Sequence, residues 1–179
     1  MQSLKQLLLT LIPILFSSTI LSQTIIGTTT YDLQSNNSGC NRLVNLGNGD
    51  ILGIWTRSVS YDIAANDRGT GYNRFSNSFW GAHPSARIES QRTGWPNIGV
   101  TRSGREFVVS HTVSSGIHFA WRNTIGSGSW NNKVLLGDPV AIWPRMANVG
   151  DTIYVITSRQ TGDSFNGVDG AISLFRSWD

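Results

Sequence analysis

Two aspartates and two arginines gather in one short polar stretch of the sequence, between residues 57 and 68. Asp62 and Asp67 could donate or accept a proton, because general acid–base catalysis uses a carboxyl group placed beside the substrate. Arg57 and Arg68 bound the stretch, and a guanidinium group recognises carboxylates through its planar fork. Tyr61 adds a ring that could stack on a ligand. The stretch therefore predicts a ligand-binding loop, with a solvated structural loop as the alternative.

The remaining cations follow the same pattern of single arginines between apolar segments. Lys5 and Lys133 are the only lysines among 14 basic residues, and the formal net charge is +3. A nucleic-acid-binding protein concentrates its basic residues in a run or on one face, so the scattered arginines argue against that class of partner. The candidate substrate-binding residues are Arg57, Arg68, Arg92, Arg159 and Tyr61.

Other kinds of catalytic site have little support in the sequence. His83, His111 and His118 do not have the spacing of metal ligands, and Glu89 and Glu106 are the only glutamates. No phosphate-binding loop, dinucleotide fingerprint or nucleophile elbow is present. We therefore expect neither a metal nor a cofactor.

A repeated hairpin organises the chain around these candidate residues. The stretch Trp95–Thr112 begins W-P and reads as strand, polar turn and strand. A second copy runs from Trp143 to Arg159, and a looser one from Cys40 to Arg57. Trp95 and Trp143 are 48 residues apart, and a hairpin at this period is typical of propeller blades.

Each complete unit should hold four short strands in about 50 residues, which is the content of one blade. The sequence thus predicts an all-β fold with about three four-stranded antiparallel blades, at approximately residues 41–90, 91–138 and 139–179. Residues 24–31 should form one further strand that completes the last blade of the ring. Three blades are fewer than the roughly four to eight of a closed propeller, so we expect the ring to be incomplete and the chain to be a fragment, with assembly with other copies as the alternative.

The N-terminal residues 1–22 have the features of a secretory signal peptide. Lys5 supplies the positive charge, Leu7 to Phe16 is apolar, and Ser22 offers a small residue for cleavage. The apolar run is too short to span a membrane. We therefore expect a secreted mature domain, residues 23–179, without a membrane span. Its sole cysteine, Cys40, cannot form an internal disulfide.

Two short motifs carry a resemblance to a known superfamily. The last residues, F-R-S-W-D, match the start of an Asp-box, S-x-D-x-G-x-T-W, with Ser177 and Asp179 in its first two motif positions. W-R-N-T-I-G-S-G-S-W, residues 121–130, is a degenerate copy that keeps Trp130 and has Ile125 in place of the aspartate. Arg122 and Arg176 precede the two turns in the same register. The mature chain thus resembles the N-terminal part of a secreted bacterial BNR-repeat propeller of the sialidase superfamily.

The resemblance implies a fold and a set of functional positions. It implies a six-bladed propeller, in which the boxes are structural turns and the loops at the opposite end bind the ligand. The sialidase R-I-P motif supplies an arginine for the sugar carboxylate, and here that position holds Gly39. A general acid would lie in an early loop, at Asp62 or Asp67. The Tyr–Glu pair of a sialidase would come from later blades.

We expect recognition of a glycan or glycoprotein at this loop-bearing end, by a chain that is not catalytically complete. One alternative is a glycoside hydrolase of exo-sialidase type whose remaining active-site residues lie beyond residue 179. Another is a protein-binding adhesion or scaffold propeller. The sequence leaves the sugar, the number of blades and the oligomeric state open.

Overall fold

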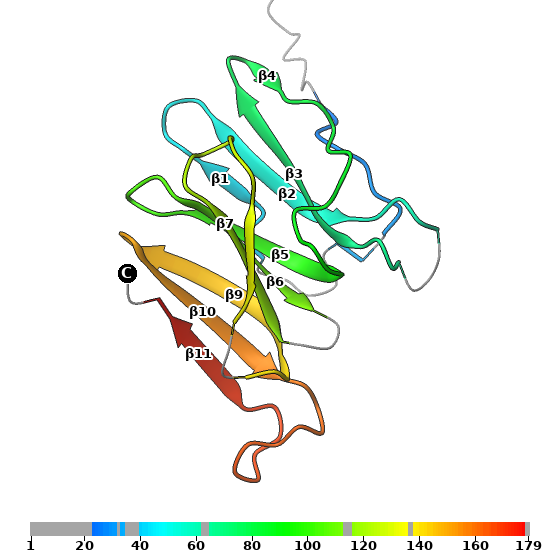
Figure 1. Cartoon of the computed structure of the whole chain (residues 1–179), viewed down its shortest axis with the longest axis vertical. Coiled ribbons are helices and arrows are strands. Elements are labelled where there is room, and N and C mark those ends of the chain that lie inside the picture. Colours follow the sequence, from blue (N-terminus) through cyan, green and yellow to red (C-terminus); the bar gives the residue numbers. More distant parts are fainter. Residues whose placement is uncertain are drawn as a thin grey trace, which may run out of the picture.

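The regular elements of the protein are all β-strands. The computed structural model describes residues 23–31, 33–34, 40–61, 65–112, 116–135 and 138–177, and we found no helix within them (Figure 1). The strands are β1 (Leu43–Asn45), β2 (Ile51–Arg57), β3 (Gly69–Ser76), β4 (Phe79–Trp80), β5 (Thr93–Val100), β6 (Glu106–Thr112), β7 (Ile117–Arg122), β8 (Asn131–Val134), β9 (Ala141–Val149), β10 (Thr152–Arg159) and β11 (Ile172–Arg176). The expectation of an all-β fold is confirmed.

These strands form three antiparallel sheets that follow one another along the chain. Sheet 1 has the order β1-β2-β3-β4, sheet 2 the order β5-β6-β7-β8, and sheet 3 the order β9-β10-β11. Strand β5 lies against sheet 1, and strand β9 lies against β5, β6 and β7 (Figure 1). The sheets are thus packed in chain order, and the described strands do not close into a ring.

Sheet 2 is the middle layer, and its strand β6 is buried on both faces. Val108 packs with Leu52 and Ile54 of sheet 1. Its neighbours Phe107 and Val109 point the other way, into the cluster that includes Ile153 and Val155 of sheet 3. Because successive side chains of a strand alternate between faces, an unbroken apolar run suits a strand that is covered on both sides.

The two W-P hairpins have the same local geometry. Trp95 and Trp143 both adopt a left-handed backbone, with φ of 50° and 54°. This region is uncommon for large residues, and the ladder register shifts just after Gly94 in sheet 2 and beside Ile142 in sheet 3. The hairpins lie in separate sheets, β5–β6 and β9–β10. They are therefore two copies of one structural unit and not parts of a continuous sheet.

The strand predicted at residues 24–31 is not present. No regular element covers the described residues 23–31, and this segment lies instead against sheet 1. The indole Nε1 of Trp55 donates to Thr28 O at 3.2 Å, Asn73 Nδ2 donates to Ile26 O at 2.7 Å, and Thr30 N donates to Ser58 O at 3.0 Å. The segment is β-prone in composition but bonds mainly to side chains, so it caps a sheet and does not extend one. The fourth strand of the first unit is short, because β4 spans only Phe79–Trp80.

The degenerate Asp-box forms a tight turn that is hydrogen-bonded to a carboxylate from outside the motif. Ser127 N donates to Thr124 O at 3.3 Å. Glu106 of strand β6 accepts a hydrogen bond of 3.0 Å from Gly126 N, which is a role that an aspartate at position 125 could have filled. Arg122 pairs with Glu106 in the ladder and is buried, whereas Arg176 pairs with Tyr154 and is exposed. The turn predicted after Arg176 extends beyond the described residues, so the common register of the two arginines stays a prediction.

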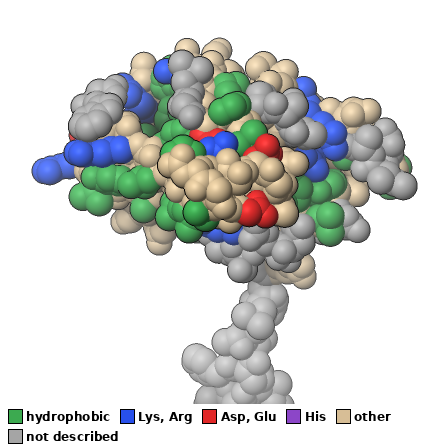
Figure 2. Space-filling model, turned by 90° about the horizontal axis from the view of Figure 1, so that it is seen from below, with side chains coloured by type: hydrophobic (Ala, Val, Ile, Leu, Met, Phe, Trp, Pro, Cys, Tyr) green, Lys and Arg blue, Asp and Glu red, His purple; other side chains and the backbone are tan. Residues whose placement is uncertain are grey.

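Sheet 3 buries one face and exposes the other. Ile153 is 6% exposed, whereas Ile172 is 70% and Leu174 is 68% exposed. In the ladder Ile156 pairs with Leu174, and Ser158 pairs with Ile172, so these side chains share one face. Seen from below, the molecule shows hydrophobic side chains between its Lys and Arg side chains (Figure 2). We call the exposed set Val149, Ile156, Ile172 and Leu174 the outer face of sheet 3.

Candidate ligand-binding rim

Arg68 is the centre of a cluster at one end of the sheets. It lies just before β3 and is 5% exposed. Its Nε donates to Thr93 O at 2.9 Å, and its Nη1 donates to the Tyr31 hydroxyl at 3.0 Å. The guanidinium carbon lies 4.7 Å from the ring centre of Trp95. A β-carbon at Gly94 would lie 3.1 Å from Arg68 Nε, so the absence of a side chain there leaves room for the guanidinium group.

Arg92 places a second cation beside Arg68. Burial lowers the pKa of Arg68, and the positive charge of Arg92 lowers it further. Arg92 is half-buried, and its buried Nε has no hydrogen-bond partner among the described residues. Within the same ranges, no carboxylate lies within ion-pair distance of either arginine. Two neighbouring cations, with no described carboxylate at ion-pair distance, favour the binding of an anion.

An aromatic wall stands next to these arginines and joins sheets 2 and 3. The rings of Trp95 and His111 stack with their centres 4.7 Å apart, and Trp143 meets Trp95 edge-on at 4.6 Å. Tyr31 also meets Trp95 edge-on, with ring centres 6.1 Å apart. Burial, together with the charge of Arg68, lowers the pKa of His111 to about 4. The histidine is therefore neutral at physiological pH.

The other predicted contact residues are distributed around the same end. Arg57 is buried and donates from Nη2 to Ser85 O at 3.0 Å. Tyr61 is 93% exposed. Arg159 lies on sheet 3, 3.7 Å from Asp138, with its guanidinium carbon 5.6 Å from the ring centre of Phe165. The structure thus brings Arg68 and Arg92 together, while Arg159 already has a carboxylate partner.

Asp67 is engaged in holding its own loop. Its carboxylate accepts hydrogen bonds from Ser58 Oγ at 2.6 Å and from the N–H groups of Val59 at 2.7 Å and Ser60 at 3.4 Å. Burial would raise the pKa of Asp67, but these hydrogen bonds outweigh it and the net shift is downward. A general acid needs the opposite shift. Asp62 lies outside the described residues, as do Gly39, Asp179 and the predicted signal peptide.

Glu89 joins sheets 1 and 2 through hydrogen bonds. It is buried, and it accepts hydrogen bonds from Thr70 N at 2.8 Å, Thr70 Oγ1 at 2.5 Å and Ser110 Oγ at 2.9 Å. Each donor lies on a strand, β3 or β6, so the carboxylate fixes the spacing of the two sheets. We assign it a structural role.

Several rim residues were not among those selected from the sequence. Tyr31, Trp95, His111 and Trp143 form the wall, and the repeated W-P pair was the signal that could have identified two of them. Their contacts join residues from three separate parts of the chain, which a linear pattern does not reveal. In the described ranges, no group of three or more His, Cys, Asp or Glu side chains is placed to hold a metal ion. Nor do these ranges contain a helix that could cross a membrane.

Comparison with known proteins adds information about the fold alone. No family model matches this sequence, and no curated protein matches it. A solved structure of a protein of unknown function from Dyadobacter fermentans is similar, with a TM-score of 0.51 and 10% identity. The similarity covers 66% of this chain and 33% of the solved one. This chain therefore spans about a third of that protein's length.

Proposed function

We propose that this chain forms part of the ring of a secreted β-propeller that is similar to BNR-repeat proteins of the sialidase superfamily. We further propose that it recognises an acidic glycan. The three sheets packed in chain order and the two matching W-P hairpins support the propeller. Export is supported by the sequence of residues 1–22. N-terminal sequencing of the secreted protein should find a start near Gln23, and an uncleaved N-terminus would contradict export through this signal.

The observation that carries the ligand proposal is the pair of neighbouring arginines at the rim. The guanidinium of Arg68 is held by Thr93 and Tyr31, which fixes a positive charge behind the more accessible Arg92. Charges interact more strongly where burial excludes water. A carboxylate bound at Arg92 would therefore also interact with the charge of Arg68. Glycans carry carboxylates in sialic and uronic acids, and Tyr61 offers an exposed ring for stacking on a sugar.

Recognition accounts for these residues better than catalysis does. Asp67, the described candidate for a general acid, has a lowered pKa and three hydrogen bonds within its loop. A glycoside hydrolase would need another proton donor. We therefore place binding ahead of hydrolysis. Turnover of a fluorogenic sialoside by the protein would reverse this order.

Calorimetric titration with sialylated, uronate-bearing and neutral oligosaccharides tests the proposal. We expect binding of the acidic ligands and none of the neutral ones. The Arg92→Gln variant should bind roughly tenfold to a hundredfold more weakly, because a charge-assisted hydrogen bond contributes about 1.5–3 kcal/mol. Arg102→Gln is the matched control, since Arg102 is exposed in the β5–β6 turn at the opposite end. Equal binding of neutral ligands, or unchanged binding by Arg92→Gln, would refute the arginine site.

A further inference from the structure

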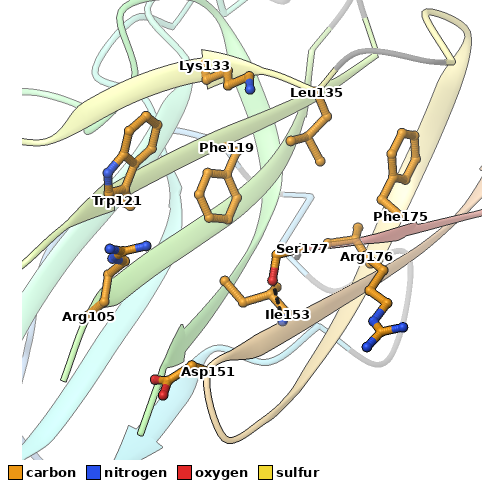
Figure 3. A pocket seen from close by; sticks show the side chains of 11 residues that line it. Arg105, Phe119, Trp121, Lys133, Leu135, Asp151, Ile153, Phe175, Arg176 and Ser177 are labelled. Atoms are coloured by element: carbon orange, nitrogen blue, oxygen red, sulfur yellow. Dashed lines mark hydrogen bonds between the residues drawn. The ribbon is translucent and has the colours of Figure 1, made fainter. Parts of the chain in front are cut away.

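A groove of about 620 Å³ runs between sheets 2 and 3 (Figure 3). Phe119 points into its centre from β7, and Trp121 lies beside it. Ile153 and Phe175 of sheet 3 form the facing wall, and Leu135 follows β8 along the upper edge. The groove is therefore aromatic and aliphatic inside. Its charged lining residues are Arg105, Lys133, Asp151 and Arg176.

At the corresponding place between sheets 1 and 2, an aromatic side chain of the chain itself packs against sheet 1. Tyr72 of β3 lies opposite Ile54 of β2, just as Phe119 of β7 lies opposite Val109 of β6, and each faces the next sheet. Over Tyr72 packs Trp130, edge-on, with ring centres 5.8 Å apart. Trp130 comes from the turn that leads into the fourth strand of sheet 2, β8. An indole that directly precedes a fourth strand thus packs against Tyr72, the residue equivalent to Phe119.

Among the described strands, sheet 3 ends at β11, whereas sheets 1 and 2 each have a fourth strand beyond the third. Ser177 N donates to Ile153 O, and Arg159 N donates to Ala171 O. Because backbone N–H and C=O groups alternate in direction along an antiparallel strand, those of the odd-numbered residues of β11 point toward β10. The N–H groups of Ile172 and Leu174 therefore point to the other edge. Such an edge is a template for a further strand.

We propose that the groove and the edge of β11 together dock a fourth strand of the same repeat. The occupant is an extended segment with the chemistry of residues 123–135, which carries an indole at Trp130 and then strand β8. It pairs with β11 through its backbone, and its indole packs over Phe119 as Trp130 packs over Tyr72. This interface is separate from the rim, so its test does not depend on glycan binding.

A synthetic peptide with the sequence of residues 123–135 tests the proposal in trans. The peptide carries a fluorescent label at one end, and binding to the full chain is followed by anisotropy. We expect saturable binding, and at least about tenfold weaker binding of the Trp130→Ala peptide, because a buried aromatic anchor dominates such interfaces. Failure to bind up to the solubility limit, or equal binding of the two peptides, would overturn the proposal.

Two protein variants test the edge independently of the groove. Leu174→Pro removes an N–H that points away from β10, whereas Leu174→Ala keeps it. We expect Leu174→Pro to abolish peptide binding and Leu174→Ala to retain it, with circular dichroism verifying that each variant is folded. If Leu174→Pro destabilises the fold, binding is instead measured with peptides in which one backbone N–H at a time is methylated. Unchanged binding by folded Leu174→Pro, or by every methylated peptide, would overturn the strand pairing.

Discussion

Glu106 and Arg122 form an ion pair of 2.7 Å between neighbouring strands, and both side chains are almost fully buried. The guanidinium carbon of Arg122 also lies 4.6 Å from the ring centre of Tyr72 and 4.3 Å from that of Trp130. The pair thus links strands β6 and β7 to an aromatic contact that reaches sheet 1. The same Glu106 carboxylate anchors the β7–β8 turn, so one acidic residue serves two neighbouring structures.

We expect Glu106→Gln to lower the free energy of unfolding by about 3 kcal/mol, because it leaves the buried charge of Arg122 without its partner. Urea denaturation measures the change. The double variant Glu106→Gln with Arg122→Met should recover part of the loss, since it removes both charges. This account would be contradicted if the double variant lost more free energy of unfolding than the two single variants lose together.

Stability should fall on acidification between pH 6.5 and pH 4. His111 has a pKa of about 4 in the folded protein, against 6.5 for the ordinary side chain. In this range the unfolded chain binds a proton that the folded protein does not, so stability is full above pH 6.5 and declines as the pH falls. The difference in pKa corresponds to roughly 3 kcal/mol. Denaturation of wild type and His111→Gln across this range measures it, and an equally steep decline in His111→Gln would contradict the assignment.

Gly99 should be intolerant of any side chain. A β-carbon at this position would lie 2.3 Å from Met146 Cε and 2.5 Å from Phe107 Cζ. We expect Gly99→Ala to cost about 1–3 kcal/mol through overpacking between sheets 2 and 3. Gly104→Ala is a useful comparison, because that glycine has φ of 83° but open space around it, so it reports backbone strain without crowding. Thermal unfolding distinguishes the two, and a smaller loss for Gly99→Ala than for Gly104→Ala would count against tight packing.

The two faces of sheet 3 should respond differently to the same substitution. Ile153→Ala removes a buried side chain and should cost about 2–5 kcal/mol. Ile172→Ala changes an exposed residue of the same type, and we expect a change within about 0.5 kcal/mol. Urea denaturation at matched protein concentrations makes the comparison. A large loss for Ile172→Ala would show that the outer face is covered in solution.

Local signals predicted the hairpins well. The W-P pair, a polar turn and a β-branched strand all lie within about 18 residues, and their geometry is set by neighbouring residues. Residues 24–31 have a similar composition but adopt no strand, because a strand needs a partner edge and this segment meets side chains of sheet 1 instead. The different burial of Arg122 and Arg176 could not be predicted from the motif for a related reason, because it depends on their ladder partners across each sheet, Glu106 and Tyr154.

The rim could be predicted only in part. Arg68 and Arg92 were selected individually, as arginines in loops, and nothing in their spacing showed that they lie together. Their proximity depends on Thr93, whose carbonyl accepts from Arg68. Tyr31 joins them from a segment 37 positions before Arg68. Contacts of this kind depend on how the sheets pack, which periodicity within a strand does not encode.

The N-terminal segment has a consequence for the order of folding. Residues 26–30 are synthesised before the strands on which they rest, and Ile26 bonds to Asn73, 47 residues later. Because its hydrogen-bond partners Trp55 and Asn73 lie on β2 and β3, we expect this segment to dock only after those strands have paired. The indole of Trp55 would then be covered late, although the residues that cover it come first in the chain.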